Sequence, residues 1–267
     1  MNPTVLDVTN LKTEFINDKK AFPIIKDVNF TLERGKVLGI VGESGCGKSV
    51  TVNTVLNLLP KNGRIAEGEI TYFDEDKPIE LQKLKQYGKE FRKLRGEKIS
   101  MIFQDPMSAL NPVYTIGNQI TEVLFEHYDI SKEEANKRAI EMLEKLGIHN
   151  AAERMNDYPH QFSGGQRQRI VIAIAMVCNP DILIADEPTT ALDVTIQAQI
   201  LDLLDDLRKE HGTSIILITH DLGVIAQIAD EVAVMYAGEI VEVGSVSQIF
   251  DEPKHPYTRS LLRSIPT

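Results

Sequence analysis

Short apolar runs alternate along the chain with segments of helical periodicity. Residues 27–33 alternate apolar and polar side chains, a pattern typical of a half-buried strand. Continuous apolar runs predict strands that are buried on both faces, at residues 36–42, 182–185, 214–219 and 231–236. Helical patterns separate these runs, at residues 48–59, 195–210 and 222–229. This order predicts an α/β fold whose core sheet is largely parallel.

The middle of the chain has a different pattern. Residues 115–177 have a helical pattern throughout and contain no strand-like run. Ser131 and Glu134 have the spacing of a capping box at a helix start, and Gly147 is the expected stop. The sequence therefore predicts one domain, residues 1–267, with a core at about 1–112 and 179–267 and an inserted all-helical subdomain at about 113–178. We expect this subdomain to move against the core rather than to pack on it rigidly.

Composition limits the class of protein. A chain of 267 residues with 42% hydrophobic content fits one large globular domain, and a net charge of −10 argues against nucleic acid as the first partner unless a local basic patch exists. Cys46 and Cys178 are too far apart to form a disulfide framework, which favours a reducing cytosol. The longest apolar stretch, residues 170–178, falls short of the roughly 20 residues that a membrane span needs. A membrane role would therefore come through a partner.

A glycine-rich loop follows the predicted strand at residues 36–42 and opens the next helix. It has the spacing G-x-x-x-x-G-K-[ST] and consists of Gly42, Glu43, Ser44, Gly45, Cys46, Gly47, Lys48 and Ser49, with Val50 directly after it. Glycines let the backbone curl so that successive N–H groups hold phosphate oxygens, and the helix dipole adds to the attraction. We expect Lys48 to reach the β- and γ-phosphates of ATP and Ser49 to bind Mg²⁺. Cys46 contributes its backbone and needs no thiol chemistry.

Polar residues also end three predicted core strands. Asp186 and Glu187 follow residues 182–185, and we expect Asp186 to hold Mg²⁺ through water and Glu187 to act as general base on the attacking water. Gln104 follows the apolar run 99–103, before a loop at residues 105–112, where it is expected to touch Mg²⁺ or that water. His220 ends the strand 214–219 and is expected to donate to the γ-phosphate. Each of these residues also has a structural alternative, at a turn or on the surface.

The run at residues 162–169, FSGGQRQR, resembles the signature motif of ABC-transporter nucleotide-binding domains, in which Leu usually stands at the place of Phe162. The other segments match that family in order: the phosphate loop, Gln104, the signature, Asp186-Glu187, Ala191-Leu192-Asp193 and His220. Together they cover nearly the whole chain. The resemblance implies the P-loop NTPase (RecA-like) fold, with an antiparallel β edge and the helical insert, and an ATPase activity coupled to transport.

The signature offers a second phosphate-binding helix start, because Ser163, Gly164 and Gly165 precede Gln166 at the beginning of a helix. The family implies that two such domains pack head to tail, so that each ATP lies between one phosphate loop and the partner's signature. Asp193 would then lie at the dimer interface. Phe15 resembles the family's adenine-stacking aromatic, which precedes the first long strand, and Phe22 is the rival.

The end of the chain carries a finer resemblance. Lys254-His-Pro-Tyr-Thr258, followed by Leu261, Leu262 and Pro266, looks like the tail of ATPases of the oligopeptide, dipeptide and nickel importer group, and residues 104–112 and 186–193 also look like that group. This implies an importer of oligopeptides or dipeptides, or of nickel or another small solute. The implied partners are a homologous second ATPase subunit, two membrane-spanning permease subunits that contact residues 105–114, and indirectly an extracytoplasmic binding protein. The implied location is peripheral, on the cytoplasmic face of the membrane.

Many peptide-type members extend past this tail with a cysteine-bearing segment that can hold an iron–sulfur cluster. Here the sequence stops at Thr267, so we expect no cluster in this chain. Three rival functions remain: a soluble ABC-type ATPase acting on nucleic acid or ribosomes, a P-loop kinase of small molecules, and an exporter ATPase. The first would normally carry two cassettes or long inserts. The second leaves the signature and His220 without a role, and the tail argues against the third.

Overall fold

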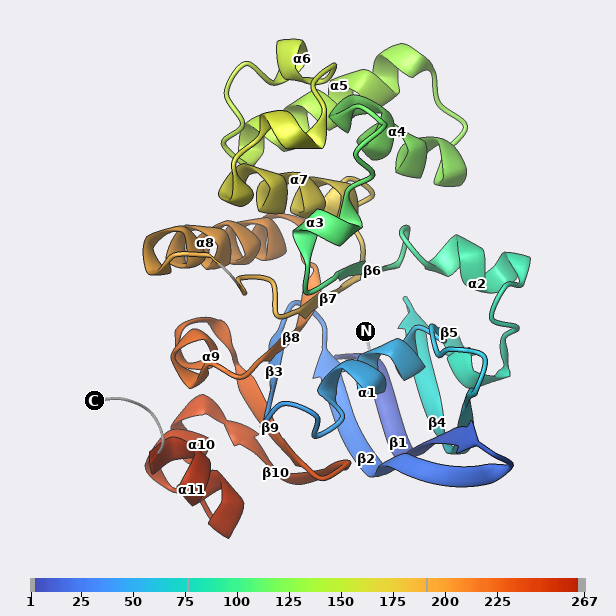
Figure 1. Cartoon of the computed structure of the whole chain (residues 1–267), viewed down its shortest axis with the longest axis vertical. Coiled ribbons are helices and arrows are strands. Elements are labelled where there is room, and N and C mark those ends of the chain that lie inside the picture. The colour runs from blue at the N-terminus through green and yellow to red at the C-terminus, as the bar shows by residue number, and fades with distance from the viewer. Residues whose placement is uncertain (1–2, 76, 191, 264–267) are drawn as a thin grey trace. The chain divides into compact units, whose positions relative to one another are not determined.

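The computed structural model describes residues 3–75, 77–190 and 192–263 (Figure 1). Contacts between residues divide the chain into two compact units. The first, called the sheet unit, comprises Met1–Arg92 and Ser214–Thr267, and the second, called the helical unit, comprises Lys93–Thr213. The predicted helical segment, residues 113–178, falls inside the helical unit, which extends beyond it on both sides. The division into a core and a moving subdomain stays a prediction.

The sheet unit contains strands in the order β5-β4-β1-β2-β10-β9-β3-β8 among its described residues. Strand β3 runs parallel to both β8 and β9, whereas β1 pairs antiparallel with β2 and β4, and β4 pairs antiparallel with β5. The strands are β1 (Thr4–Asn17), β2 (Lys20–Glu33), β3 (Val37–Val41), β4 (Gly63–Asp74), β5 (Lys77–Glu80), β8 (Ser214–Thr219), β9 (Glu231–Tyr236) and β10 (Glu239–Ser245). The predicted parallel core with an antiparallel β edge is confirmed.

The central strands have the burial that their apolar runs predict. Every residue of β3 and of β8 is buried, and β9 is buried except at its two ends. Both faces of such strands are covered, which explains why their sequences are continuously apolar rather than alternating. The helices of this unit are α1 (Lys48–Val55), η1 (Leu81–Lys83), α9 (Leu222–Ile228), α10 (Val246–Asp251) and α11 (Pro256–Arg263), and α2 (Lys89–Leu94) spans its boundary.

Two local expectations in the sheet unit are wrong. The helix predicted at residues 48–59 ends at Val55, because Asn57 takes a left-handed backbone with φ 49° and breaks the periodicity. Phe15 lies inside β1 rather than before the first long strand, since β1 and β2 are both longer than the alternation at residues 27–33 indicates. Register shifts interrupt β1 between Val8 and Leu11, and such bulges hide a strand from a test for strict alternation.

The helical unit holds the parallel strand pair β6 (Ile99–Ile102) and β7 (Ile182–Asp186). Its helices are α3 (Pro106–Ala109), α4 (Ile116–His127), α5 (Lys132–Lys145), α6 (Ala151–Arg154), η2 (Pro159–Gln161), α7 (Gly164–Met176) and α8 (Val194–His211). All of residues 115–177 are described and none is in a strand, so the prediction of a helical middle segment is confirmed. The segment 105–112, expected as a loop, contains the short helix α3.

Helix α5 begins and ends where the sequence predicts. The Ser131 hydroxyl accepts the Glu134 N–H at 3.2 Å, and the Glu134 carboxylate pairs with Arg138 one turn further on. Gly147 follows the last turn with φ 74°, and its N–H donates to the carbonyl of Glu144 at 2.9 Å. Among the described residues, no helix combines the length and apolar character that a membrane crossing requires.

Candidate functional site

The phosphate loop connects β3 to α1 and is shaped by close backbone contacts. A Cβ atom at Gly42 would lie 2.2 Å from the carbonyl oxygen of Met235, so only glycine fits there. Gly47 is the N-cap of α1 with φ 114°, and a Cβ at that position would lie 2.8 Å from the side chains of Ile25 and Met235. The packing of the loop against β9 and β2 therefore requires glycine at positions 42 and 47, whereas Gly45 is favoured by its left-handed φ of 81°.

Lys48 is the first residue of α1 and is 6% exposed. Its Nζ donates to the carbonyls of Gly42 at 2.6 Å and Glu43 at 3.0 Å. Cys46 N–H donates to the same Glu43 carbonyl at 3.2 Å, while the Cys46 carbonyl accepts the N–H of Gly238 at 2.9 Å. These bonds close the curl of the loop and hold a cation next to it, at the start of a helix.

Cys46 itself is a buried thiol. Burial raises the pKa of Cys46 above its usual value, and Lys48 only partly opposes this effect. The thiol therefore stays protonated at neutral pH and is a poor nucleophile. This agrees with the interpretation that the backbone of Cys46, and not its sulfur, serves the site.

His220 reaches the same sheet edge as the phosphate loop. Strands β3 and β8 are parallel neighbours, with Val41 paired to Thr219. Gly42 and His220 are the first residues after these two strands, and the His220 side chain is exposed. The Thr219 hydroxyl accepts the N–H of Asp221, which in turn caps α9. The structure thus brings His220 and the loop together at the carboxyl end of the sheet, where ligands bind in α/β folds.

Gln104 and Glu187 form a hydrogen-bonded pair in the helical unit. Ile102 pairs with Ala185 in the parallel β6–β7 ladder, so the residues after these strands leave the sheet side by side. Gln104 Nε2 donates to Glu187 Oε2 at 2.9 Å, and the hydroxyl of Thr190 donates to the same oxygen at 2.9 Å. These two donors orient the carboxylate. Asp186, the last residue of β7, is 5% exposed.

The backbone at Glu187 is unusual. Its φ is 49°, a left-handed conformation that a residue with a side chain adopts at a cost of about 1–3 kcal/mol. Strain of this kind persists where the surrounding structure enforces it, and it is concentrated at functional sites. The direction in which the Glu187 carboxylate leaves β7 is therefore determined by the backbone as well as by Gln104 and Thr190.

The signature residues open helix α7. The Ser163 hydroxyl accepts the Gln166 N–H at 3.3 Å, and Gln166 Oε1 accepts the Ser163 N–H at 3.1 Å, which completes a capping box. The Gln166 side chain is therefore used within the helix start, while Ser163 and Gly164 are exposed. The position where the family usually has Leu is filled by Phe162, which is buried beneath the Arg154 guanidinium at 3.9 Å from the ring centroid.

Asp193 caps helix α8, where its carboxylate accepts the Ile196 N–H at 3.0 Å. A Cβ atom at Gly165 would lie 3.0 Å from Ile196 Cγ2, so the signature and the first turn of α8 are adjacent. Asp193 is exposed and has this capping role whatever else it does. Ala191 of the same motif lies outside the described residues, as does Pro266 of the tail motif.

The two candidate adenine-stacking residues face each other across the β1–β2 ladder. Phe22 is 49% exposed, whereas Phe15 is half-buried and close to Gly63, at which a Cβ would lie 2.9 Å from the Phe15 ring. Both therefore remain candidates, Phe22 with the more accessible ring face.

The predicted site residues divide between the two units. The sheet unit brings together the phosphate loop, Val50 at the start of α1, and His220. Phe15 also lies in the sheet unit, and the helical unit carries the remaining predicted residues: Gln104, Ser163, Gly164, Gly165, Gln166, Asp186, Glu187 and Asp193. Two polar contacts had no assigned role in the sequence prediction, Thr190 on Glu187 and Tyr257 on the phosphate loop.

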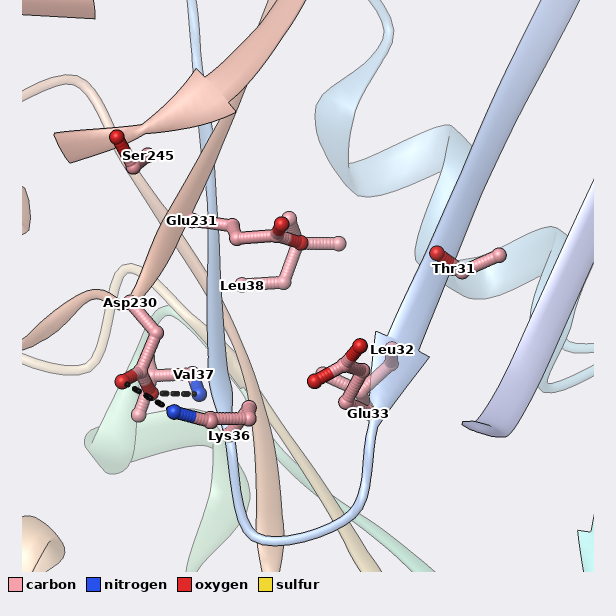
Figure 2. Close-up of a pocket in the computed structure, with 9 residues that line it drawn as sticks. All are labelled: Thr31, Leu32, Glu33, Lys36, Val37, Leu38, Asp230, Glu231 and Ser245. Atoms are coloured by element: carbon pink, nitrogen blue, oxygen red, sulfur yellow. Dashed lines mark hydrogen bonds and ion pairs between the residues drawn. The ribbon is translucent and has the colours of Figure 1, made fainter. Parts of the chain in front are cut away.

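A cavity of about 230 Å³ lies elsewhere in the sheet unit, at the opposite end of β3 (Figure 2). The Asp230 carboxylate accepts the Val37 N–H at 2.8 Å and pairs with Lys36 Nζ at 3.3 Å (Figure 2). The cavity is at the amino end of β3, whereas the phosphate loop follows the carboxyl end. It is therefore separate from the candidate site.

Comparisons with known proteins agree on one family. The family described as ABC transporter matches residues 25–190, and the family described as oligopeptide/dipeptide transporter, C-terminal region, matches residues 241–267. The chain is 55% identical over 264 residues to the oligopeptide transport ATP-binding protein OppD of Bacillus subtilis, covering 98% of this chain and 72% of that protein. It is 52% identical to the dipeptide transport ATP-binding protein DppD of the same organism, covering 98% and 77%.

Among solved structures, a dimeric post-hydrolysis state of an ATP-binding cassette bound to ADP and Pi matches with a TM-score of 0.77 at 30% identity, covering 90% of this chain and 98% of that one. A dimeric bacterial ABC transporter cassette matches with the same TM-score at 31% identity and the same coverage. The predicted fold class is thus confirmed.

Proposed function

Because the chain belongs to the ABC transporter family, we propose that it is the ATP-binding and ATP-hydrolysing subunit of a membrane importer of oligopeptides or dipeptides. The observation that carries this proposal is the match of residues 241–267 to the oligopeptide/dipeptide transporter C-terminal region, on the same chain as the phosphate loop and the signature. The relatives at 50–55% identity are named as ATP-binding proteins of oligopeptide, dipeptide or peptide transport. None of these findings supports the alternative of an ATPase acting on nucleic acid or ribosomes.

ATP is held by the loop at residues 42–49. The loop's backbone N–H groups and the α1 dipole attract the phosphates, and Lys48, which lies against the loop carbonyls, supplies the cation for the β- and γ-phosphates. His220 leaves the sheet beside the loop and donates to the γ-phosphate. The adenine ring stacks on Phe15 or Phe22, of which Phe22 is the more exposed.

Glu187 acts as general base. A carboxylate held by Gln104 and Thr190 is ready to take a proton from the attacking water without reorganising. Mg²⁺ would be held by oxygen donors, the Ser49 hydroxyl, the Gln104 amide oxygen and the Asp186 carboxylate, which is the donor chemistry that this ion prefers. When bound, the ion neutralises charge on the phosphates. Gln104 can serve both roles because its nitrogen donates to Glu187 while its oxygen accepts.

The site is completed by a second ATPase subunit, which we propose to be homologous rather than identical. Ser163 and Gly164 are exposed at the start of a 13-residue helix, a geometry that favours an anion. They would receive the γ-phosphate of ATP bound to the partner's loop, with Asp193 at the same interface. The isolated chain should consequently bind ATP but hydrolyse it slowly.

A groove in the helical unit is the proposed contact for a permease subunit. Its volume is about 710 Å³, and it is lined mainly by residues of α4 and of the loop before it, including Tyr114 and Phe125, together with Ala109 of α3 and Ile174 of α7. Tyr114 and Phe125, which both line the groove, are 54% and 47% exposed, and Val113 beside Tyr114 is 71% exposed. Large apolar side chains exposed around one groove are typical of a protein–protein contact. Gln119 donates to the carbonyls of Asn111 and Tyr114, both at 3.0 Å, and so fixes the loop. The chain would thus lie peripherally, on the cytoplasmic face of the membrane.

Tyr114→Ala/Phe125→Ala is expected to weaken the permease contact, because both side chains line the groove. Removal of an aromatic side chain at an interface centre costs about 2 kcal/mol, so we expect roughly thirtyfold weaker binding to permease subunits in detergent. Tyr87→Ala is the matched control, because Tyr87 is 79% exposed in the sheet unit and lies outside the groove. Equal copurification of permease with the double variant and with the control would contradict the assignment of this groove.

The function itself is tested by peptide uptake. Cells that lack this chain should take up a radiolabelled dipeptide or oligopeptide only when the chain is supplied together with its permease subunits. Peptide import would be rejected if cells lacking the chain still took up the peptide but no longer took up a different solute. That result would leave the ATPase assignment in place.

A further inference from the structure

The C-terminal tail contacts the phosphate loop. The backbone N–H of Glu43, the second residue of the loop, donates to the hydroxyl of Tyr257 at 3.0 Å. Tyr257 is the second residue of α11, which in Figure 1 lies with α10 beside β10. Both ends of this hydrogen bond belong to the sheet unit. A residue of the tail motif thus contacts the segment that receives phosphate.

The tail that presents Tyr257 is fixed by the sheet. The carboxylate of Glu242 on β10 accepts the N–H of Lys254 at 2.7 Å and the N–H of His255 at 3.0 Å. His255 Nδ1 accepts the N–H of Tyr257 at 3.2 Å, and Arg259 Nε donates to the Pro253 carbonyl at 2.9 Å. The chain leading into α11 is therefore held at successive residues, and the position of Tyr257 is well determined.

The ring of Tyr257 is held as well. It packs on the ring of Tyr236, the last residue of β9, with 4.4 Å between the centroids and 40° between the planes. Burial raises the pKa of Tyr257, so its hydroxyl keeps its proton at neutral pH and offers Glu43 a neutral acceptor. The neighbouring β9–β10 turn donates from Gly238 to the Cys46 carbonyl at 2.9 Å.

The phosphate loop is thus held at two points by C-terminal elements, at Glu43 by Tyr257 and at Cys46 by Gly238. Glu43 lies between Gly42 and Ser44, where the backbone turns away from β3. A loop that is fixed in its binding shape loses less conformational entropy when it takes up a ligand. The Glu43 N–H donates its hydrogen bond to Tyr257 and not to a phosphate. It therefore supports ATP binding by fixing the shape of the loop.

We propose that Tyr257 is a positioning residue of the nucleotide site, whose hydroxyl holds the Glu43 N–H and so fixes the curve of the phosphate loop. The proposal rests on the proposed function, since it assumes that ATP binds at residues 42–49. It gives the tail at residues 254–258 a physical role in the ATPase, whatever solute the importer carries.

Tyr257→Phe tests this role, because it removes one hydroxyl and keeps the ring on Tyr236. One hydrogen bond of this kind changes an equilibrium by about two- to tenfold, and we expect the Kd for MgATP to rise by that factor. The turnover number at saturating ATP should stay within about twofold, since the Glu187 base is untouched. Hydrogen exchange of the Glu43 amide should accelerate, with the urea unfolding midpoint unchanged. Tyr236→Phe is the matched control and should behave as wild type in all four measurements.

Wild-type Kd and wild-type exchange at Glu43 in Tyr257→Phe would overturn the proposal. An equal rise in Kd in Tyr236→Phe would also overturn it, because the effect would then not depend on the Glu43 contact. Lys48→Ala in the same titration separates this failure from failure of the proposed function. If Lys48→Ala loses ATP binding and Tyr257→Phe does not, only the positioning role is wrong; if Lys48→Ala binds ATP normally, the phosphate-loop assignment fails.

Discussion

Glu187→Gln is expected to abolish ATP turnover while leaving ATP binding intact. The amide has nearly the shape of the carboxylate and can keep the hydrogen bonds to Gln104 and Thr190, which now meet at Glu187 Oε2. It cannot accept the proton of the attacking water, and loss of a general base lowers rates by about 10²- to 10⁴-fold. Phosphate release and ATP binding should be measured on the same preparation, with the partner ATPase subunit present.

The control for Glu187→Gln is Glu90→Gln, the same change at an exposed position of α2. It should turn over ATP at the wild-type rate. The Glu187 variant should in addition stay associated with its partner subunit when MgATP is present, because ATP that is not hydrolysed does not release the closed pair. Normal steady-state hydrolysis by Glu187→Gln would reject Glu187 as the base.

Lys48→Ala is expected to lose nucleotide affinity. Lys48 is buried with its Nζ against two loop carbonyls, and hydrogen bonds that involve a charged group contribute about 1.5–3 kcal/mol. We therefore expect a Kd for MgATP that is about 10- to 100-fold higher, measured by titration of a fluorescent nucleotide. Lys61→Ala, an exposed lysine beyond the end of α1, should leave the Kd unchanged. Unchanged affinity in Lys48→Ala would remove the basis for the phosphate-loop assignment.

The core of the fold could be predicted closely from the sequence. Strands β8 and β9 have the predicted bounds, and β3 differs by one residue at each end, because burial on both faces makes each of them a short continuous apolar run. Strand β1 could not be predicted in the same way. It lies in the antiparallel edge, its burial is mixed, and its register shifts break the alternation that identifies a strand.

The candidate site was predictable where its chemistry is contiguous in sequence. The loop at residues 42–49 has a spacing that can be identified alone, whereas the pair Asp186-Glu187 points to a site only in combination with that loop. Contacts between distant segments leave no such pattern. Glu43 and Tyr257 are 214 residues apart in the sequence. The tail motif indicated the class of transporter but not the contact between Tyr257 and the phosphate loop.

Two further features depend on three-dimensional geometry. The left-handed backbone of Glu187 could not be predicted from the sequence, because glutamate rarely adopts a positive φ. Phe162 was a departure from the family pattern, and the structure explains it. The ring fills a buried position and lies under Arg154, so the larger side chain is accommodated by a cation–π contact.

The most direct test of the account is ATP hydrolysis by this chain assembled with its partner ATPase and permease subunits in proteoliposomes. We predict that hydrolysis rises when the peptide-loaded binding protein is added, that peptide accumulates at the expense of MgATP, and that Glu187→Gln in this chain strongly reduces both. A rate of hydrolysis that is the same with and without peptide, with no accumulation in the vesicles, would contradict the claim that this ATPase powers peptide import.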